Sequence, residues 1–241
     1  MAMILLFTDF GAEGPYLGQM EAVLRRRAPG VDVINLLSNA PAGDPRRSSY
    51  LLAALCRYFP AESVFLGVVD PGVGGERLPV ALLADRRWFV GPENGLLNTV
   101  ALCSSAAEWL RVDWRPERLS MSFHGRDLFA PIAARIARGD FGWGSSYSGP
   151  DLGAWPADLP EIVYFDHYGN AITGTRYSHA LDGRMLVVNA RRIPQAETFC
   201  GVAESEAFWY RNSMDLVEIA VNRGRADADL GLALGTVIRF L

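Results

Sequence analysis

The sequence predicts an α/β N-terminal domain with a mostly parallel sheet, followed by a small antiparallel β-barrel C-terminal domain. Three observations lead to this prediction. Strand and helix patterns alternate over the first two-thirds of the 241 residues, as a parallel sheet with crossover helices requires. Residues 139–160 are rich in Gly, Ser, Trp and Pro without periodicity, and short strand patterns separated by turns follow from Glu161. We expect domains over residues 1–155 and 160–241, with the link running through residues 139–160.

The first elements form a strand–helix–strand unit. A buried strand is expected at Ile4–Phe7, and a helix begins at about Tyr16 with apolar side chains at helical spacing. That helix ends at Arg25–Arg27 and Pro29-Gly30, where the cations suit the helix dipole. The next strand is expected at Val31–Leu37.

A second helix is expected after Asp44, which can act as an N-cap and is followed by Pro45 at the first helical position. Ser63–Val69 is almost continuously apolar, as a strand covered on both faces must be. The remaining elements predicted here are an antiparallel hairpin and two helices: strands Pro79–Ala84 and Trp88–Val90 around the turn Asp85–Arg87, then helices Leu96–Cys103 and Pro131–Arg138.

The C-terminal region shows a different pattern, in which short strands are separated by turn residues. The expected strands are Ile162–Phe165, Ala171–Thr175, Met185–Asn189, Leu216–Val221 and Val237–Leu241. About 80 residues of this kind favour a small antiparallel barrel.

Charge and composition exclude several classes of protein. A net charge of -4 argues against a dedicated nucleic-acid binder, which needs a basic face. All 23 positively charged residues are arginine, so chemistry that depends on lysine, such as pyridoxal phosphate anchoring, is excluded. The three cysteines are odd in number and widely spaced, which fits reduced thiols better than a disulfide framework. The apolar N-terminal run is too short for a signal peptide or a membrane span. We expect a cytoplasmic protein that contacts no membrane.

Motifs for common cofactors and metals are missing from the sequence. It contains no GxGxxG, GxxxxGK[ST], HExxH or GxSxG segment. The three histidines, His124, His167 and His179, form no ligand cluster by spacing, so no metal site is expected.

Acidic and glycine-rich segments follow the predicted strands, at the edge where open α/β sheets bind ligands. After the first strand, the carboxylate of Asp9 could accept both hydroxyls of a ribose; equally, it could cap the following helix. After the third apolar strand, a loop with three glycines contains Asp70 and Arg77. This pair could hold a reactive carboxylate in its ionised form, or it could be a structural salt bridge.

Three further segments are candidates for the site. His124 lies between Phe123 and a glycine at a strand–helix junction, where it could be a general base, an orienting group or a histidine satisfied by its neighbours. Gly91–Gly95 is a tight turn at a strand end. In the C-terminal region, Asp166, Tyr168 and Asn170 share a turn that, taken alone, is typical of an ordinary hairpin.

Seven segments, taken in order, are far more specific than any one of them: TDFG, YLGQM, DPGVGGER, GPENGLL, FHGRD, DHYGN and NSMDLVEIAVN. Together they resemble the S-adenosyl-L-methionine hydrolase family (SAM hydroxide adenosyltransferases), which is related to the fluorinase and chlorinase enzymes. The resemblance covers essentially the whole chain. It implies a SAM-binding α/β domain, a small β-barrel domain and a homotrimer with sites shared between subunits. In the implied reaction, water or hydroxide attacks C5′ of the ribose and releases adenosine and L-methionine.

The resemblance also implies roles for single residues. Asp70, Arg77 and His124 match the set that surrounds the nucleophilic water in the hydrolases. The implied substrate-binding residues are Asp9 for the ribose, Phe123 beside the substrate, Asp166, Tyr168 and Asn170 for the methionine amino group and the adenine, and Ser213 for the methionine carboxylate. S-adenosyl-L-methionine is then the substrate, and no cofactor or metal is implied.

Two alternatives to the hydrolase stay open. A halogenase would form a 5′-halo-adenosine, but a carboxylate such as Asp70 beside the nucleophile repels an anion. A non-catalytic binder of adenosyl ligands would use Asp70 and Arg77 only as structural groups. The sequence also departs from the family pattern: Gly14 replaces an Asp, and Asn39 and Gly43 replace His and Gln. These departures affect the expected nucleoside contacts.

Overall fold

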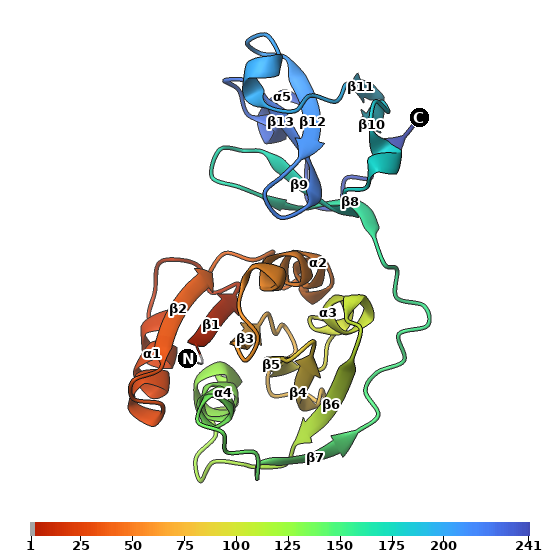
Figure 1. Cartoon of the computed structure of the whole chain (residues 1–241). Helices are drawn as coiled ribbons and strands as arrows, with labels where there is room; N and C mark the ends of the chain where they lie inside the picture. The colour runs from red at the N-terminus through yellow and green to blue at the C-terminus, as the bar shows by residue number, and fades with distance from the viewer. Residues whose placement is uncertain (1–2) are drawn as a thin grey trace. The chain divides into compact units, whose positions relative to one another are not determined.

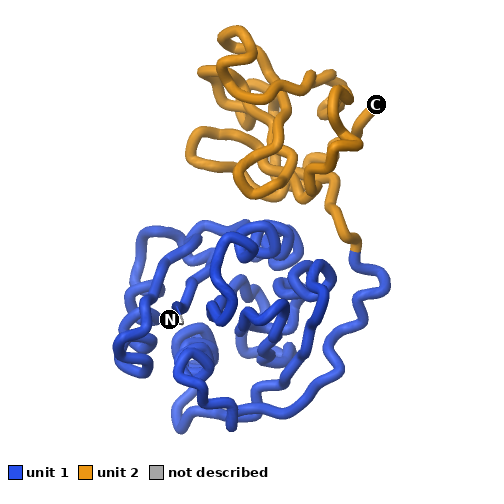
Figure 2. Tube along the Cα trace, in the orientation of Figure 1, with its two compact units in different colours: residues 1–155 blue, residues 156–241 orange. Residues whose placement is uncertain are grey.

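The computed structural model describes residues 3–241, which form two compact units. The division falls between Trp155 and Pro156, and Figure 2 shows the two units in different colours. We describe each unit by itself. Within residues 3–241, no helix combines the length and the apolar character needed to cross a membrane.

Unit 1 is built around a mixed sheet of seven strands in the order β2-β1-β3-β5-β4-β6-β7. Five strands run in the same direction, while β4 and β7 run in the opposite one. The prediction of a sheet with mostly parallel strands is therefore confirmed. The strands are β1 (Met3–Thr8), β2 (Asp32–Leu37), β3 (Val64–Val68), β4 (Pro79–Ala84), β5 (Arg87–Pro92), β6 (Ala107–Val112) and β7 (Gly144–Tyr147).

Helices cover both faces of this sheet (Figure 1). Helix α1 (Tyr16–Arg27) packs with α4 (Ala130–Ala137) on one face, and α2 (Pro45–Leu55) packs with α3 (Asn98–Cys103) on the other. Strand β1 supplies apolar side chains to both layers. Ile4 and Leu6 join the core beneath α1 and α4, whereas Leu5 and Phe7 are fully buried and point to the opposite face. Burial on both faces explains why the parallel strands have continuous apolar sequences.

Local signals set several element boundaries as expected. The Asp44 side chain accepts the Arg47 backbone N–H at 2.9 Å and so caps α2, with Pro45 at its first position. In the β4–β5 hairpin, Asp85 and Arg86 have φ of 45° and 64°, as a two-residue turn between twisted strands requires. The prediction was wrong at Arg87, which pairs with Ala84 inside the ladder and is not part of the turn.

The prediction of an irregular link over residues 139–160 was also wrong in part. Strand β7 lies within this segment and pairs with β6, although no strand is predicted there from the sequence. The reason is that β7 is a short edge strand, with exposed Ser145 and Ser146 and no apolar alternation. Gly144 fits because a Cβ there would approach the Arg111 carbonyl oxygen to 2.4 Å.

Unit 2 contains two antiparallel sheets that share one apolar core. The four-stranded sheet has the order β12-β13-β9-β8, and the three-stranded sheet has the order β11-β10-β14. Their strands are β8 (Leu159–Phe165), β9 (Ala171–Arg176), β10 (Leu186–Val188), β11 (Arg191–Ile193), β12 (Ala207–Arg211), β13 (Leu216–Val221) and β14 (Arg239–Phe240). The antiparallel character is confirmed, whereas closure into one barrel stays a prediction. Strands β11 and β12 and the short helix α5 (Ala226–Asp229) were not predicted.

The order of the central strands of unit 1 determines where a ligand can bind. Strand β1 lies between β2 and β3, and the connections through α1 and α2 leave on opposite faces of the sheet. This arrangement opens a crevice at the carboxyl ends of β1 and β3. The loops that begin there carry Asp9 and Asp70.

Candidate active site

Asp9 lies in the loop after β1 and is held by the loop after β2. Its carboxylate accepts the Gly43 backbone N–H at 2.8 Å, and the Gly11 N–H donates to the Ser38 carbonyl at 2.6 Å. Helix α1 begins seven residues after Asp9 and has Pro15 at its N-cap without a side-chain cap. The alternative that Asp9 caps this helix is therefore wrong. Gly43 has a φ of +64°, so a glycine suits the position at which the backbone reaches Asp9.

Asp70 and Arg77 form a desolvated ion pair in the loop after β3. The Arg77 Nε–H lies 3.1 Å from both carboxylate oxygens of Asp70, and a second guanidinium nitrogen donates to Oδ2. Only 4% of the Asp70 side chain and 10% of the Arg77 side chain are exposed. The guanidinium also lies 5.2 Å from the centre of the Phe129 ring. This two-point contact fixes the rotamer of the Asp70 carboxylate.

The Asp70 loop is anchored by its neighbours. The Asn94 side chain donates to the Val69 carbonyl at 2.8 Å, which connects the end of β3 to the turn after β5. Gly74 has a φ of +79°, and a Cβ there would lie 2.6 Å from the Met121 carbonyl oxygen. The loop therefore packs against the segment that leads to His124, and only glycine allows this approach.

His124 joins the ion pair through Arg77. One of the terminal guanidinium nitrogens of Arg77 lies 2.8 Å from His124 Nδ1. Because a guanidinium can only donate, Nδ1 must be the acceptor, and the neutral ring carries its proton on Nε2. Burial, and then the charge of Arg77, lower the pKa of His124 below its ordinary 6.5. The result is a neutral imidazole next to an ionised carboxylate.

Asp9, Asp70 and His124 border a pocket of about 220 Å³ within unit 1. One side of it is aromatic: the rings of Phe10, Tyr16 and Phe123 lie with centroids 5.3–5.9 Å apart. The pocket is lined by Asp9, Phe10, Tyr16, Val68, Asp70, Pro71, Val73, Ser122, Phe123, His124 and Gly125. The sequence candidates Asp9, Asp70, Phe123 and His124 thus meet at one pocket, with Arg77 bonded to two of them.

The candidates of unit 2 lie on two turns. Asp166 accepts both the backbone N–H and the side-chain amide of Asn170, each at 2.9 Å. Asn170 is buried, whereas Tyr168 between them is 72% exposed. Ser213 is exposed on the separate turn between β12 and β13. Within the described residues the structure therefore joins Asp166 to Asn170 but makes no direct bond from either to Ser213.

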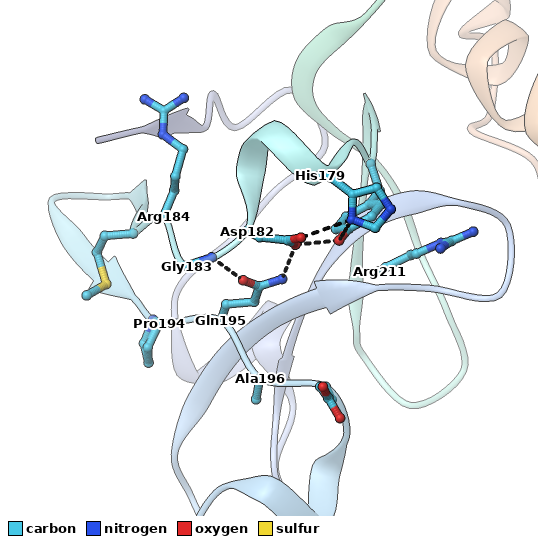
Figure 3. A pocket seen from close by; sticks show the side chains of 11 residues that line it. His179, Asp182, Gly183, Arg184, Pro194, Gln195, Ala196 and Arg211 are labelled. Atoms are coloured by element: carbon cyan, nitrogen blue, oxygen red, sulfur yellow. Dashed lines mark hydrogen bonds and ion pairs between the residues drawn. The ribbon is translucent and has the colours of Figure 1, made fainter.

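A larger pocket of unit 2, about 790 Å³, contains none of the predicted site residues. Asp182 accepts hydrogen bonds there from Tyr177, His179 and Gln195, and Figure 3 shows it between His179 and Gln195. The first two of these bonds contribute most to lowering the pKa of Asp182 to about 2. The Arg211 guanidinium lies 5.2 Å from the centre of the Tyr177 ring.

Three contributors to the unit 1 site were not predicted from the sequence. Phe10 and Tyr16 supply two of the three aromatic rings, and the Gly43 N–H holds Asp9. Phe10 and Tyr16 stand in the quoted segments TDFG and YLGQM, so their location was marked although their role was not. The bond from Gly43 joins residues 34 positions apart, and no local pattern indicates it.

Together these features define a class of protein. The chain is a two-unit α/β protein in which a carboxylate, an arginine and a histidine meet beside a small aromatic pocket, at the switch point of an open sheet. Family models agree: the SAM hydroxide adenosyltransferase N-terminal domain matches residues 4–143, and the C-terminal domain of the same name matches residues 160–239. The chain belongs to the SAM hydroxide adenosyltransferase family.

Two named enzymes match this chain over nearly its whole length. The (R)-S-adenosyl-L-methionine hydrolase of Thermus thermophilus is 38% identical, with all of both chains covered. The enzyme of the same name from Salinispora arenicola is 36% identical over 96% of this chain and 95% of its own. Among solved structures, a conserved protein of Thermotoga maritima matches with a TM-score of 0.90 at 29% identity, covering 99% of both chains. A conserved hypothetical protein of Thermus thermophilus matches with a TM-score of 0.81 at 36% identity over 100% of both chains.

The bond between Arg77 and His124 predicts a definite tautomer and pH dependence. We expect nitrogen-15 NMR to show His124 as the Nε2–H tautomer, with a pKa below 6.5. A lowered pKa keeps the ring neutral at pH 7, so a turnover step that needs neutral His124 is lost only as the pH falls through that lower value. Because Asp70 raises the pKa of His124 and Arg77 lowers it, Arg77→Met should move the acidic limb to higher pH.

With only three histidines in the chain, the signals can be assigned by their loss in His124→Gln. An Nδ1–H tautomer, or a pKa above 6.5, would contradict the arrangement.

Proposed function

We propose that this protein hydrolyses S-adenosyl-L-methionine to adenosine and L-methionine by attack of water on C5′ of the ribose. The observation that supports this function best is the pairing of an ionised Asp70 with a neutral His124 beside one pocket, both held by Arg77. The 38% identical relative from Thermus thermophilus and the 36% identical one from Salinispora arenicola are named as hydrolases of this sulfonium compound.

The chemistry of the substrate explains why this set of side chains is sufficient. A sulfonium carries a positive charge and leaves as a neutral thioether, so the leaving group needs no general acid. The protein must supply a water molecule that is positioned in line with the C5′–S bond and partly desolvated. The buried pocket edge and the fixed side chains of Asp70 and His124 suit this task.

The hydrogen-bond roles assign a different task to each side chain. His124 donates from Nε2 to the oxygen of the water, since its Nδ1 is already occupied by Arg77. Asp70 retains acceptor capacity beyond Arg77 and takes one proton of the water as the C5′–O bond forms and the C5′–S bond breaks. The electron pair of the broken bond stays on sulfur, which becomes the thioether of methionine.

The other candidates hold the substrate. We propose that Asp9 accepts the ribose hydroxyls and that Phe123 lies beside the substrate, as part of the aromatic side of the pocket. Asp166, Tyr168 and Asn170 contact the methionine amino group and the adenine, and Ser213 holds the methionine carboxylate. S-adenosyl-L-methionine enters as the substrate, and the reaction uses no separate cofactor or metal.

Asp9→Ala is expected to weaken substrate binding. The loss of charged hydrogen bonds to the ribose should raise KM by about 10- to 100-fold, and misplacement of C5′ also lowers kcat. Steady-state kinetics check this, with Asp32→Ala as a matched control because Asp32 is exposed at the opposite end of the parallel strands. Unchanged affinity in Asp9→Ala would show that Asp9 does not hold the ribose.

The direct test is to incubate the purified protein with S-adenosyl-L-methionine and separate the products by chromatography. Hydrolysis yields adenosine and methionine in equal amounts, and added chloride or fluoride leaves this result unchanged. A 5′-halo-adenosine product would instead identify a halogenase, and intact substrate bound without turnover would identify a binding protein.

We also propose that the active species is a homotrimer with sites shared between subunits. The unit 1 pocket of about 220 Å³ is smaller than the ~300–1,000 Å³ typical of ligand sites, which suits a site completed by another surface. The remaining candidates lie in unit 2, where we propose that the two sheets close into a barrel. We further propose a cytoplasmic location, because Cys56, Cys103 and Cys200 form no disulfide within the described residues.

A further inference from the structure

Glu218 is a buried carboxylate that the reaction described above does not use. It lies in the middle of β13, is 4% exposed, and interrupts a run of apolar residues. Tyr210 donates its hydroxyl proton to Oε1, and the Asn212 side-chain amide donates to Oε2 at 2.9 Å. Burial raises the pKa of this carboxyl group, and the charge of Asp166 raises it further. A buried carboxylate costs stability unless it is paired or hydrogen-bonded, and these two bonds offset part of that cost.

The bonds made by Asn212 show what the Glu218 carboxylate does in this position. Its side-chain carbonyl accepts the backbone N–H groups of Met214 and Leu216, both at 2.9 Å. These two bonds fix the orientation of the amide group, whose NH₂ end must then find an acceptor in the interior, because Asn212 is only 6% exposed. Glu218 provides that acceptor.

The turn fixed in this way is the one that carries Ser213. Asn212 lies at its start, and Asp215 completes it with a φ of 61° and a backbone bond back to Asn212 of 3.1 Å. Within the described residues the hydroxyl of Ser213 makes no hydrogen bond, and its side chain is exposed. The turn therefore presents the exposed hydroxyl of Ser213 on a backbone whose conformation is fixed by the buried side chain of Asn212.

Glu218 also lies within electrostatic reach of the second turn. Asp166 acts on the pKa of both Glu218 and Tyr210, and the β9–β13 ladder pairs Glu218 with Ile172, two residues after Asn170. One buried carboxylate thus connects the turn of Ser213 with the neighbourhood of Asp166 and Asn170.

We propose that Glu218 is a positioning residue for the methionine half of the substrate: through Asn212 it holds the turn that presents Ser213 to the methionine carboxylate. This inference rests on the proposed function, because that function assigns the carboxylate to Ser213. Glu218 itself touches no reacting atom. Its removal therefore weakens recognition of the carboxylate and leaves the attack on C5′ nearly intact.

The test compares two substrates that differ only in that carboxylate. Glu218→Ala is expected to raise KM for S-adenosyl-L-methionine by about tenfold or more, to change kcat by less than about threefold, and to leave KM for decarboxylated S-adenosylmethionine within about twofold. Glu218→Gln should restore near wild-type KM, since its carbonyl can accept from Asn212 and its amide can donate to the Tyr210 oxygen. Tyr210→Phe is the matched control: it removes the other bond to Glu218 and should leave both KM values near wild type.

Each other result contradicts the proposal. Equal weakening of both substrates means that Glu218 acts only on overall stability, and an unchanged KM for S-adenosyl-L-methionine means that it does not position the turn. If Glu218→Ala does not fold, Asn212→Ala makes the same comparison. If the wild type does not turn the substrate over, the proposed function fails. Calorimetric affinities for the two compounds then still test Glu218 separately.

Discussion

Asp70→Asn is expected to abolish most of the turnover while the affinity for S-adenosyl-L-methionine stays within about tenfold, because the role we propose for Asp70 is to act on the water and not on the substrate. The expected fall in kcat is about 10²- to 10⁴-fold, the usual contribution of a positioned proton acceptor. Asparagine is the better replacement. Asp70→Ala removes turnover equally but leaves the Arg77 guanidinium buried and unpaired, at a cost of about 3–5 kcal/mol in folding stability.

The measurement combines kcat with the Kd from calorimetry, and Glu76→Gln serves as the control. Glu76 belongs to the same loop and is exposed, so its neutralisation should change neither quantity. Wild-type turnover in Asp70→Asn would remove Asp70 from the mechanism. A loss of affinity as large as the loss of kcat would mean that Asp70 holds the substrate.

Mixing two inactive variants is expected to restore activity. In the proposed homotrimer, His124→Ala damages the unit 1 half of each shared site and Asn170→Ala the unit 2 half, so each parent is expected to be nearly inactive. In a mixed trimer, one of the three boundaries brings the intact halves together. After random exchange of equal amounts, about a quarter of all boundaries are intact, so about a quarter of wild-type activity should return.

Exchange itself is checked by mass spectrometry of the intact oligomers. Absence of recovery despite demonstrated exchange would mean that both halves of a site come from one chain. Full activity in a monomeric fraction would lead to the same conclusion.

The central part of the fold could be predicted because its strands are buried on both faces. Ile4–Leu6 and Val64–Val68 are continuously apolar, and the glycine-rich loops after them mark the carboxyl edge of the sheet. The edge strand β7 carries no such signal: it is mostly polar and exposed, since it pairs on one side only. Strand β12 did carry a signal, the aromatic run Phe208–Tyr210, from which no strand was predicted.

The residues of the candidate site could be predicted from the sequence, but the hydrogen bonds that join them could not. Asp70, Arg77 and His124 stand in distinctive segments, yet the bond from Arg77 to Nδ1 that decides the tautomer joins residues 47 positions apart. Asp9 could equally have been a helix cap until the structure placed Pro15 at that position. Glu218 is an acid within an apolar strand, but its partners Tyr210 and Asn212 become apparent only when β12 and β13 are paired.

The attack of water on C5′ is tested most directly by running the reaction in water enriched in oxygen-18 and measuring the masses of both products by mass spectrometry. Attack at C5′ predicts that one oxygen-18 atom enters adenosine, at the 5′-hydroxyl, and that methionine remains unlabelled. Labelled adenosine should form with the wild type, whereas Asp70→Asn should form almost no adenosine and therefore no labelled product. Unlabelled adenosine, a label in methionine, or a 5′-halo-adenosine in place of adenosine would contradict hydrolysis at C5′.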